Sequence, residues 1–322
     1  MISSSDDTKR PASKGAGVYI LGGLVLAAII GAGVFWFVTE PHPVGEERLA
    51  SIEGVEADAA RGEKVFWAGG CVSCHAADGA EGKDRLVLSG GHRLTSDFGT
   101  FVVPNISSDP DAGIGSWDIA AFSNAMLAGV SLDGSHLYPS FPYGSYIRMS
   151  DQDVADLYAF MKTLPASDKT NAPHELKFPF SIRRLVGGWK FLFLNDDPRV
   201  QIANADDQVS RGQYLVEGPG HCGECHTPRD LLGGLKTDEW LAGAPNPEGK
   251  GVVPNITPGG PDISGWSASD IAYYLESGFT PDFDSVGGSM VDVQKNMAEL
   301  EPSDREAIAA YLKAIPAHSN GD

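Results

Sequence analysis

The sequence contains two Cys-x-x-Cys-His motifs, which together use all four of its cysteines. The first runs from Cys71 to His75 and the second from Cys222 to His226. This spacing is the attachment signature of c-type haem, in which two thiols bind the porphyrin edge and the adjacent His ligates the iron. We therefore predict two haem c groups. Their covalent attachment sites and axial histidines would be Cys71, Cys74, His75, Cys222, Cys225 and His226.

Other chemistry for these cysteines fits the sequence less well. A zinc site could use both pairs, but they lie about 150 residues apart, in separate copies of an internal repeat. A thioredoxin-like pair needs a βαβ context, which the sequence lacks. No cysteine remains for a catalytic thiol.

Methionine is the second candidate iron ligand, because cytochromes c commonly use it as the sixth ligand. Met149 lies in a predicted loop just before the last helix of the first copy, so we predict that it ligates the first iron. In the second copy the choice is between Met290 and Met297. We favour Met290, which follows a Gly-Gly-Ser loop. Met297 lies nearer the final helix, as Met149 does, and stays the alternative.

An axial His also needs an acceptor for its other ring nitrogen. The carbonyls of Pro104 and Pro254 are candidates, because each lies about thirty residues after its motif in a repeated Val-Pro-Asn-Ile block. A plain turn is the alternative for this block. We expect the histidines without a repeat partner at the surface, with His221 shielding a haem edge. They are His42, His92, His136, His174, His221 and His318.

The internal repeat predicts two copies of one domain. Five blocks recur in the same order at an offset of about 150 residues. They begin at Arg61 and Arg211, Cys71 and Cys222, Val102 and Val252, Trp117 and Trp266, and Phe160 and Tyr311. Because alternating β-branched runs are few, we predict an all-α fold of two tandem cytochrome c domains after an N-terminal transmembrane helix.

The repeat and the composition set the expected boundaries. These are a cytoplasmic tail (1–16), a transmembrane anchor (17–38), a linker (39–56), domain 1 (57–165), an inter-domain linker (166–208), domain 2 (209–317) and a tail (318–322). The inter-domain linker is rich in aromatic residues, so we expect it to pack against both domains. Each domain should begin with a helix, around 57–68 and 209–216.

Each domain should also end with a helix that has its own cap. Ser150 with Asp153 resembles a capping box, and Ser303 with Glu306 is a full one. Apolar residues follow each box at helical spacing.

Residues 17–38 carry no charge and span about 33 Å as a helix, enough for a bilayer core of roughly 30 Å. Lys9, Arg10 and Lys14 precede them and acidic residues follow, so the positive-inside rule places the N-terminus in the cytoplasm. A cleaved signal peptide is the alternative. We favour a retained anchor, because bulky aromatic residues (35–37) occupy the place of a small-x-small cleavage site.

The net charge is −19, and so acidic a chain repels nucleic acid. The charge either steers basic partners or serves solubility alone.

Several segments resemble the cytochrome c subunits of bacterial membrane-bound alcohol, aldehyde and gluconate dehydrogenases. The resemblance covers roughly residues 58–316. It rests on the segments that begin at Pro104, Gly115, Leu137, Met149, Phe178 and Gly220. Members of that family usually carry three haem motifs, and this chain has two.

The resemblance implies an electron-transfer protein at the bacterial inner membrane, single-pass, with its haem domains in the periplasm. It would take electrons from a dehydrogenase subunit and pass them to quinone, another cytochrome or a terminal oxidase, without a substrate of its own. The alternative is a dihaem redox enzyme, such as a peroxidase or a thiosulfate-oxidising cytochrome. The known thiosulfate type would need a cysteine ligand, and none is left over.

Overall fold

The computed structural model describes residues 14–246, 249 and 251–319. The chain divides into two compact units, residues 1–40 and 41–322, which are described separately. Most of the predicted cytoplasmic tail (1–16) and residues 320–322 of the predicted C-terminal tail lie outside the described residues.

The described part of the first unit is essentially one helix, α1 (Lys14–Val38). Its segment Tyr19–Val38 is long and apolar enough to cross a membrane, and none of it is buried in protein. Its bounds agree with the expected span of 17–38 within three residues. Length and composition are shared by anchors and signal sequences, so they do not separate the two.

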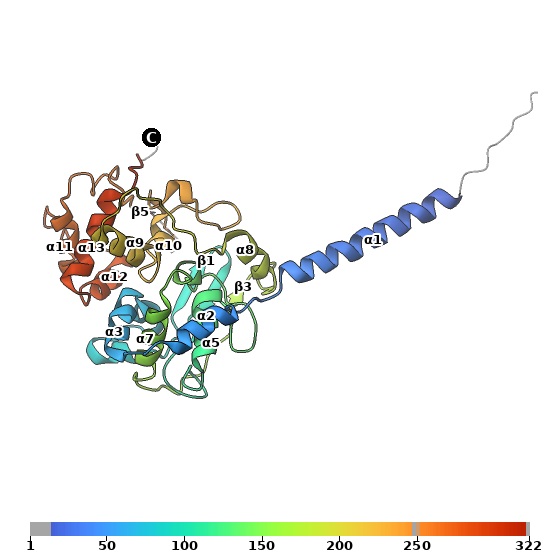
Figure 1. Cartoon of the computed structure of the whole chain (residues 1–322), viewed down its shortest axis with the longest axis horizontal. Helices are drawn as coiled ribbons and strands as arrows, with labels where there is room; N and C mark the ends of the chain where they lie inside the picture. The colour runs from blue at the N-terminus through green and yellow to red at the C-terminus, as the bar shows by residue number, and fades with distance from the viewer. Residues whose placement is uncertain (1–13, 247–248, 250, 320–322) are drawn as a thin grey trace, which may run out of the picture. The chain divides into compact units, whose positions relative to one another are not determined.

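The second unit is mostly helical (Figure 1). Its α-helices are α2 (Glu46–Gly54), α3 (Ala59–Ala68), α4 (Cys71–His75), α5 (Ile119–Ala128), α6 (Tyr143–Tyr146), α7 (Asp151–Met161), α8 (Leu185–Phe193), α9 (Asp207–Glu217), α10 (Gly223–His226), α11 (Ala268–Ser277), α12 (Met290–Met297) and α13 (Pro302–Ala314). Two 3₁₀ turns, η1 (Gly82–Leu86) and η2 (Thr237–Glu239), complete the helical set among the described residues.

Two helix pairs, α3 with α7 and α9 with α13, cross at glycines. A Cβ atom at Gly62 would lie 1.9 Å from the backbone oxygen of Asp156, and one at Gly212 would lie 1.9 Å from that of Ala307. Only glycine permits such close approach of two backbones. These are the glycines of the repeated Arg-Gly blocks, so the sequence repeat corresponds here to a repeated helix crossing.

The caps of the two closing helices differ from each other. The Ser150 hydroxyl accepts a hydrogen bond from the backbone N–H of Asp153 and caps α7, as expected. The expected capping box of Ser303 with Glu306 is wrong: α13 begins at Pro302 and has no side-chain cap. Proline's fixed φ suits the first helical position, so the helix starts two residues earlier than a Ser303 cap would place it and encloses Ser303 in its first turn.

Two small antiparallel sheets were not predicted. One has the order β1 (Arg93–Ser96), β2 (Gly99–Val102), β3 (Glu175–Leu176), and the other pairs β4 (Ala244–Pro245) with β5 (Val252–Val253). Strands of two to four residues are too short to show the alternation that identifies a strand in a sequence.

The two segments expected to be linkers take part in the folded unit. Within 39–56, α2 packs on α7 and buries Ile52, which is 1% exposed. Within 166–208, the backbone carbonyl of Ser167 accepts a hydrogen bond from the buried Asn105.

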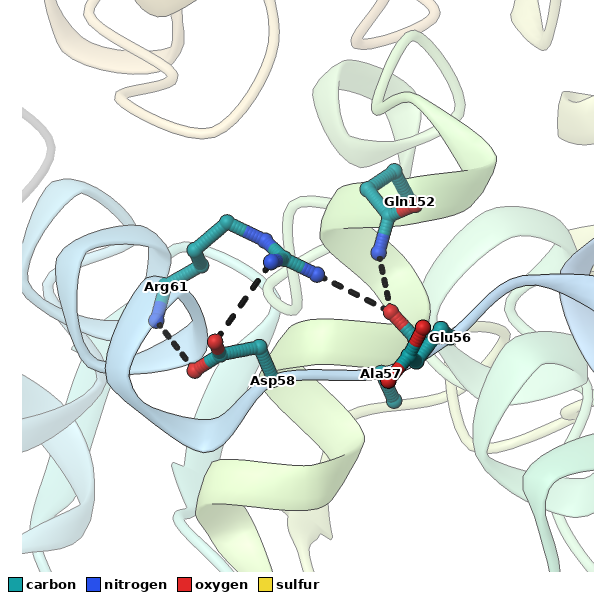
Figure 2. Close-up of a pocket in the computed structure, with 5 residues that line it drawn as sticks. All are labelled: Glu56, Ala57, Asp58, Arg61 and Gln152. Carbon is teal, nitrogen blue, oxygen red and sulfur yellow. Dashed lines mark hydrogen bonds and ion pairs between the residues drawn. The ribbon is translucent and has the colours of Figure 1, made fainter.

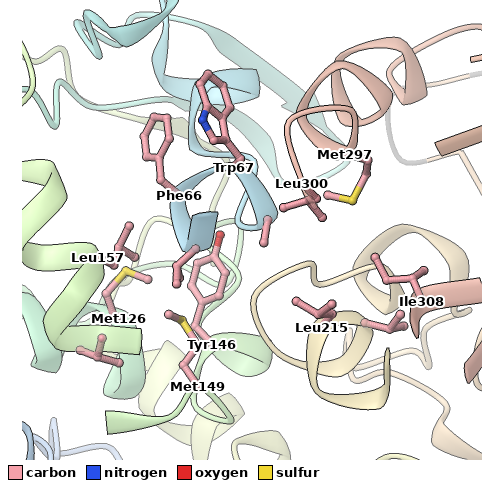
Figure 3. Close-up of a cluster of buried hydrophobic side chains, with 14 of the residues drawn as sticks. Phe66, Trp67, Met126, Tyr146, Met149, Leu157, Leu215, Met297, Leu300 and Ile308 are labelled. Carbon is pink, nitrogen blue, oxygen red and sulfur yellow. The ribbon is translucent and has the colours of Figure 1, made fainter. Parts of the chain in front are cut away.

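One continuous apolar core joins the two copies of the repeat (Figure 3). Phe66, Trp67 and Met149 belong to it from the first copy, and Met297 and Ile308 from the second. The two sets of helices are therefore not independent: side chains of both contribute to one core.

Candidate functional site

Short helices carry both Cys-x-x-Cys-His motifs. The first motif is α4, which starts directly after Gly70, a residue in the left-handed region with φ 59°. Along one helical turn, residues i, i+3 and i+4 share a face. Cys71, Cys74 and His75 therefore lie on one side of α4, as attachment to a single porphyrin requires. In the second motif, Cys222 is the N-cap residue of α10.

Each motif histidine is held by a backbone carbonyl. Nδ1 of His75 lies 2.8 Å from the Pro104 oxygen, and Nδ1 of His226 lies 2.8 Å from the Pro254 oxygen. A carbonyl only accepts, so Nδ1 must carry the proton and Nε2 keeps the lone pair that can ligate a metal. The structure thus places the two proline carbonyls, proposed as acceptors from sequence, within hydrogen-bond distance.

The backbone carbonyl of each motif histidine accepts a hydrogen bond from a glycine. The N–H of Gly90 donates to the His75 carbonyl and that of Gly243 to the His226 carbonyl, both at 2.8 Å. Both glycines have positive φ, 62° and 89°. A Cβ at Gly90 would meet the Pro104 carbonyl at 2.4 Å, so glycine here lets the loop approach the histidine's acceptor.

Two buried asparagines, which the sequence analysis did not single out, fasten these loops. Asn105 Nδ2 donates to the Ser167 carbonyl at 2.7 Å, and Asn255 Nδ2 donates to the His318 carbonyl at 2.6 Å. The repeated Pro-Asn pair was the signal that could have identified them. The second bond also ties His318, expected in a tail, to the folded unit.

Burial at both motifs favours the neutral form of ionisable groups. It lowers the pKa of His75 to about 4 and lowers the pKa of His226. It raises the pKa of the Cys71 and Cys222 thiols to about 12. Neutral imidazole is the form that ligates a metal, so both histidines are in the required state at pH 7.

The three candidate methionines occupy different environments. Met149 is 1% exposed and lies in the turn between α6 and α7. Met290 is half-buried at the first position of α12, and Met297, at its last position, is 5% exposed. In Figure 3 Met297 lies beside Leu300, within the apolar core. Met297 therefore already has a packing partner there.

The two motif segments contact each other through His221. Its Nε2–H donates to the Gly69 carbonyl at 3.2 Å, and the Tyr146 hydroxyl donates to the same oxygen at 3.1 Å. His221 directly precedes Cys222, and Gly69 lies two residues before Cys71. The connection between the two attachment segments is therefore short.

Asn296 makes a second connection between the copies. It is fully buried, and its Nδ2 donates to the Ser73 hydroxyl at 2.7 Å while its Oδ1 accepts from Arg85 at 2.7 Å. Ser73 lies between the two cysteines of the first motif. Its partner comes from 223 residues away, so sequence pattern alone could not identify it.

The expectation of surface positions is wrong for His136. It is 3% exposed, and its carbonyl accepts a hydrogen bond from Arg183 of the inter-domain segment. Of the other five, His42 is exposed and four are half-buried: His92, His174, His221 and His318. The segment after the first copy covers His136, and such long-range packing leaves no local pattern.

A polar pocket beside α3 is a helix-capping cluster (Figure 2). Arg61 and Gln152 both donate to the Glu56 carbonyl, at 2.9 and 3.0 Å. Arg61 also pairs with the buried Asp156 at 2.7 Å, and the Asp58 side chain caps α3. Because these groups bind one another, the pocket is explained by fold stability.

Comparisons with known proteins show a consistent resemblance. Residues 59–165 match the family model described as Cytochrome c. The chain is 57% identical to a "Diheme cytochrome c-type" protein of Cereibacter sphaeroides, over 92% of this chain and 97% of that protein. It is 35% identical to the "Fructose dehydrogenase cytochrome subunit" of Gluconobacter japonicus, over 87% of this chain. It is also 35% identical to the "Alcohol dehydrogenase (quinone), cytochrome c subunit" of Gluconobacter oxydans, over 81% of this chain. It spans 55% of the length of each of these two subunits.

Proposed function

The chain belongs to the cytochrome c family, and we propose that it is a membrane-anchored electron carrier with one haem c in each of two tandem domains. The observation that carries this proposal is the repeated arrangement of a motif histidine with a proline carbonyl, at His75 with Pro104 and at His226 with Pro254. A second site of the same construction supports a second haem.

The donor set fits haem c. Each motif supplies two thiols and a neutral imidazole whose Nε2 keeps its lone pair. Bound haem supplies a one-electron Fe(III)/Fe(II) couple. In this proposal the four cysteines would hold the porphyrins and the two histidines would ligate the irons. Met149 and Met290 would supply thioether ligands, with Met297 as the alternative to Met290.

The proposed domains are residues 57–165 and 209–317. Their support is the set of interactions that recur at equivalent positions: the glycine helix crossings, the His–carbonyl bonds and the Pro-Asn loop anchors. The segments 39–56 and 166–208 would act as packed connectors, since both contribute buried contacts.

A short connection links the two attachment segments and would hold the two haems near each other. From Cys71 the backbone runs through Gly70 to the Gly69 carbonyl, and one hydrogen bond leads on to His221 and the adjacent Cys222. The chain's role here is to hold the two attachment segments together.

The relatives and α1 support a proposal for the partners and the location. We propose that the chain sits in the bacterial inner membrane through α1, with residues before it in the cytoplasm and both haem domains in the periplasm. The electron donor would be a dehydrogenase subunit, since two relatives are named as cytochrome subunits of dehydrogenases. The acceptor would be quinone, another cytochrome or an oxidase.

Haem counting tests the central claim. Acid–acetone extraction should leave the colour on the polypeptide, and a pyridine haemochrome assay should give two haems per chain. Paired Cys→Ser changes at Cys71 and Cys74, or at Cys222 and Cys225, should each leave one. Free haem in the extract, or a ratio that one pair of changes does not halve, would refute two independent sites.

Membrane attachment is tested by flotation. The full chain should float with lipid vesicles in a density gradient, and its intact mass should include residues before Gly17. A soluble product that begins near Glu40 would show a cleaved leader.

A further inference from the structure

The segment 177–195 differs in charge from the rest of the chain. It contains Lys177, Arg183, Arg184 and Lys190 and no acidic residue, in a chain of net charge −19. Six of its residues are also large apolar side chains with substantial exposure. They are Phe178, Phe180, Ile182, Leu185, Phe191 and Leu192.

Helix α8 within this segment buries its one charged residue and exposes large apolar side chains. Val186, Gly187 and the cation Lys190 are buried, whereas Phe191 is 70% exposed and Leu192 is 58% exposed. A helix on a protein surface in water normally buries its apolar face and exposes its charges. The outward face of α8 therefore suits surroundings less polar than water.

The buried lysine fixes this orientation. Its Nζ donates to the carbonyls of Ala128 and Gly129, at 2.6 Å each, and lies 4.8 Å from the centre of the Tyr143 ring. These carbonyls end α5, where they have no partner within the helix. Helix α8 cannot turn its apolar face inward without removing these bonds.

The apolar surface continues into the turn that precedes α8. Phe178 is 80% exposed and Ile182 is 44% exposed. The backbone of Leu185 bonds back to Ile182 at 3.0 Å, so the turn runs directly into the helix. Phe180 packs edge-on against Phe98 at 4.7 Å, which braces the turn against the sheet region.

We propose that segment 177–195 lies in the interface of an anionic lipid bilayer. Exposed Phe and Leu beside Lys and Arg are the composition of interfacial membrane-binding segments. Anionic headgroups attract the exposed Lys177 and the half-buried Arg183 and Arg184, and they repel the acidic remainder of the chain, which selects this face for the membrane.

The short connection between α1 and α2 limits how far the second unit can lie from a bilayer. Residues 39–45 connect α1 to α2, and seven extended residues reach at most about 25 Å. The second unit must then stay near the lipid surface whenever α1 is inserted. This step rests on the proposed membrane anchor.

Site-directed spin labelling of the full chain in phosphatidylcholine–phosphatidylglycerol vesicles tests the proposal. Labels are placed at Phe191→Cys and, in a second protein, at Phe178→Cys. Phe283→Cys is the matched control, because Phe283 is 88% exposed and lies outside the segment. Both segment labels should become accessible to oxygen and protected from a water-soluble nickel chelate, whereas the control label should remain accessible to the chelate.

The outcomes separate this proposal from the anchor. If the chain floats with the vesicles but both segment labels stay as accessible to the chelate as the control, the interfacial proposal is overturned and the anchor stands. If protection appears only after a partner protein is added, the surface belongs to that protein and the lipid proposal is overturned. If the chain does not float, neither α1 nor segment 177–195 binds the vesicles, and both proposals are overturned.

Discussion

At the scale of single residues, the two motif histidines are oriented by backbone carbonyls and not by carboxylates. A carbonyl fixes the tautomer but carries no titratable charge. Because burial also disfavours the imidazolium form, the axial nitrogen should stay available over a wide pH range. In addition, the backbone N–H groups of Gly90 and Gly243 donate to the backbone carbonyls of the two histidines. Both the side chain and the backbone of each histidine are therefore held by hydrogen bonds.

The choice between the two methionines of α12 is a prediction at this scale. Met290→Ala should lower one of the two reduction potentials and remove the far-red band of one thioether-ligated ferric haem, because a Met ligand raises the potential. Met297→Ala should keep both spectra but lower the free energy of unfolding by about 2–5 kcal/mol, since Met297 is buried. Redox titration and urea unfolding measure the two effects. The opposite pattern would make Met297 the ligand.

Asp156 gives a pH-dependent prediction. Burial by itself raises the pKa of Asp156, but the hydrogen bonds from Arg61, Asp58 and Gln152 outweigh it and hold that pKa below its usual value. Its stabilising effect is therefore present above the unfolded pKa of about 3.9 and is lost as the pH falls through the lower folded value. Asp156→Asn should lower the free energy of unfolding by about 1–3 kcal/mol at pH 7.

The measurement for Asp156 is urea unfolding in detergent from pH 7 down to pH 3. The difference in free energy of unfolding between Asp156→Asn and the unchanged chain should become smaller as the pH falls toward 3. Asp292→Asn is the control, because Asp292 forms an exposed ion pair with Lys295 and should shift stability by less than about 0.5 kcal/mol. A loss at Asp156 that is the same at every pH would contradict the ion-pair explanation.

At the scale of elements, α8 depends on one buried lysine. Burial lowers the pKa of Lys190 to about 7, against about 10.4 in the unfolded chain. Between these values the unfolded state binds the extra proton, so the stability of the chain should rise with pH across this window. Lys190→Met removes both bonds to the α5 carbonyls and should cost about 1–3 kcal/mol, with a larger loss at pH 10 than at pH 6.

Urea unfolding of the Lys190→Met chain at pH 6 and pH 10 measures this effect. Lys295→Met is a matched control, since Lys295 is exposed on α12. Equal losses for Lys190→Met at both pH values would show that the buried amine titrates as it does in water.

The elements also show what the sequence could predict. Helices α3, α7, α9 and α13 were anticipated, because apolar spacing and an N-terminal polar residue are local signals. The predicted start of α13 was wrong because the helix begins at Pro302, which places Ser303 inside its first turn and not at its N-cap. Helix α8 was missed: it contains Gly187 and Gly188, and it buries Lys190 while Phe191 and Leu192 are exposed, so its pattern resembles no core-facing helix.

Some residues of the candidate site could be predicted from the sequence and others could not. The motif residues and the proline carbonyls could be proposed from spacing and repetition alone. His221 and Asn296 could not, because their partners, Gly69 and Ser73, come from the other copy of the repeat, 152 and 223 residues away. Contacts between copies have no counterpart within either copy, so the repeat itself gives no signal for them.

At the scale of the whole molecule, the contacts of His221 and Asn296 form the junction between the two attachment segments. This junction determines the position of one segment relative to the other. A shared apolar core already joins the copies, but apolar contacts tolerate small shifts. Directional bonds do not, and Asn296 makes two of them beside the first motif. The junction should therefore matter more for the register of the two segments than for their association.

Asn296→Ala tests this role of the junction. The change leaves Arg85 and Ser73 without their partner, so the free energy of unfolding should fall by about 1–3 kcal/mol. Electron redistribution between the two haems, followed after rapid partial reduction, should slow because the connection between the attachment segments loosens. Lys295→Ala, one residue away and exposed, should change neither quantity. A chain that loses stability but redistributes electrons at the original rate would show that Asn296 only packs the interface, and that the His221–Gly69 connection alone keeps the two segments in register.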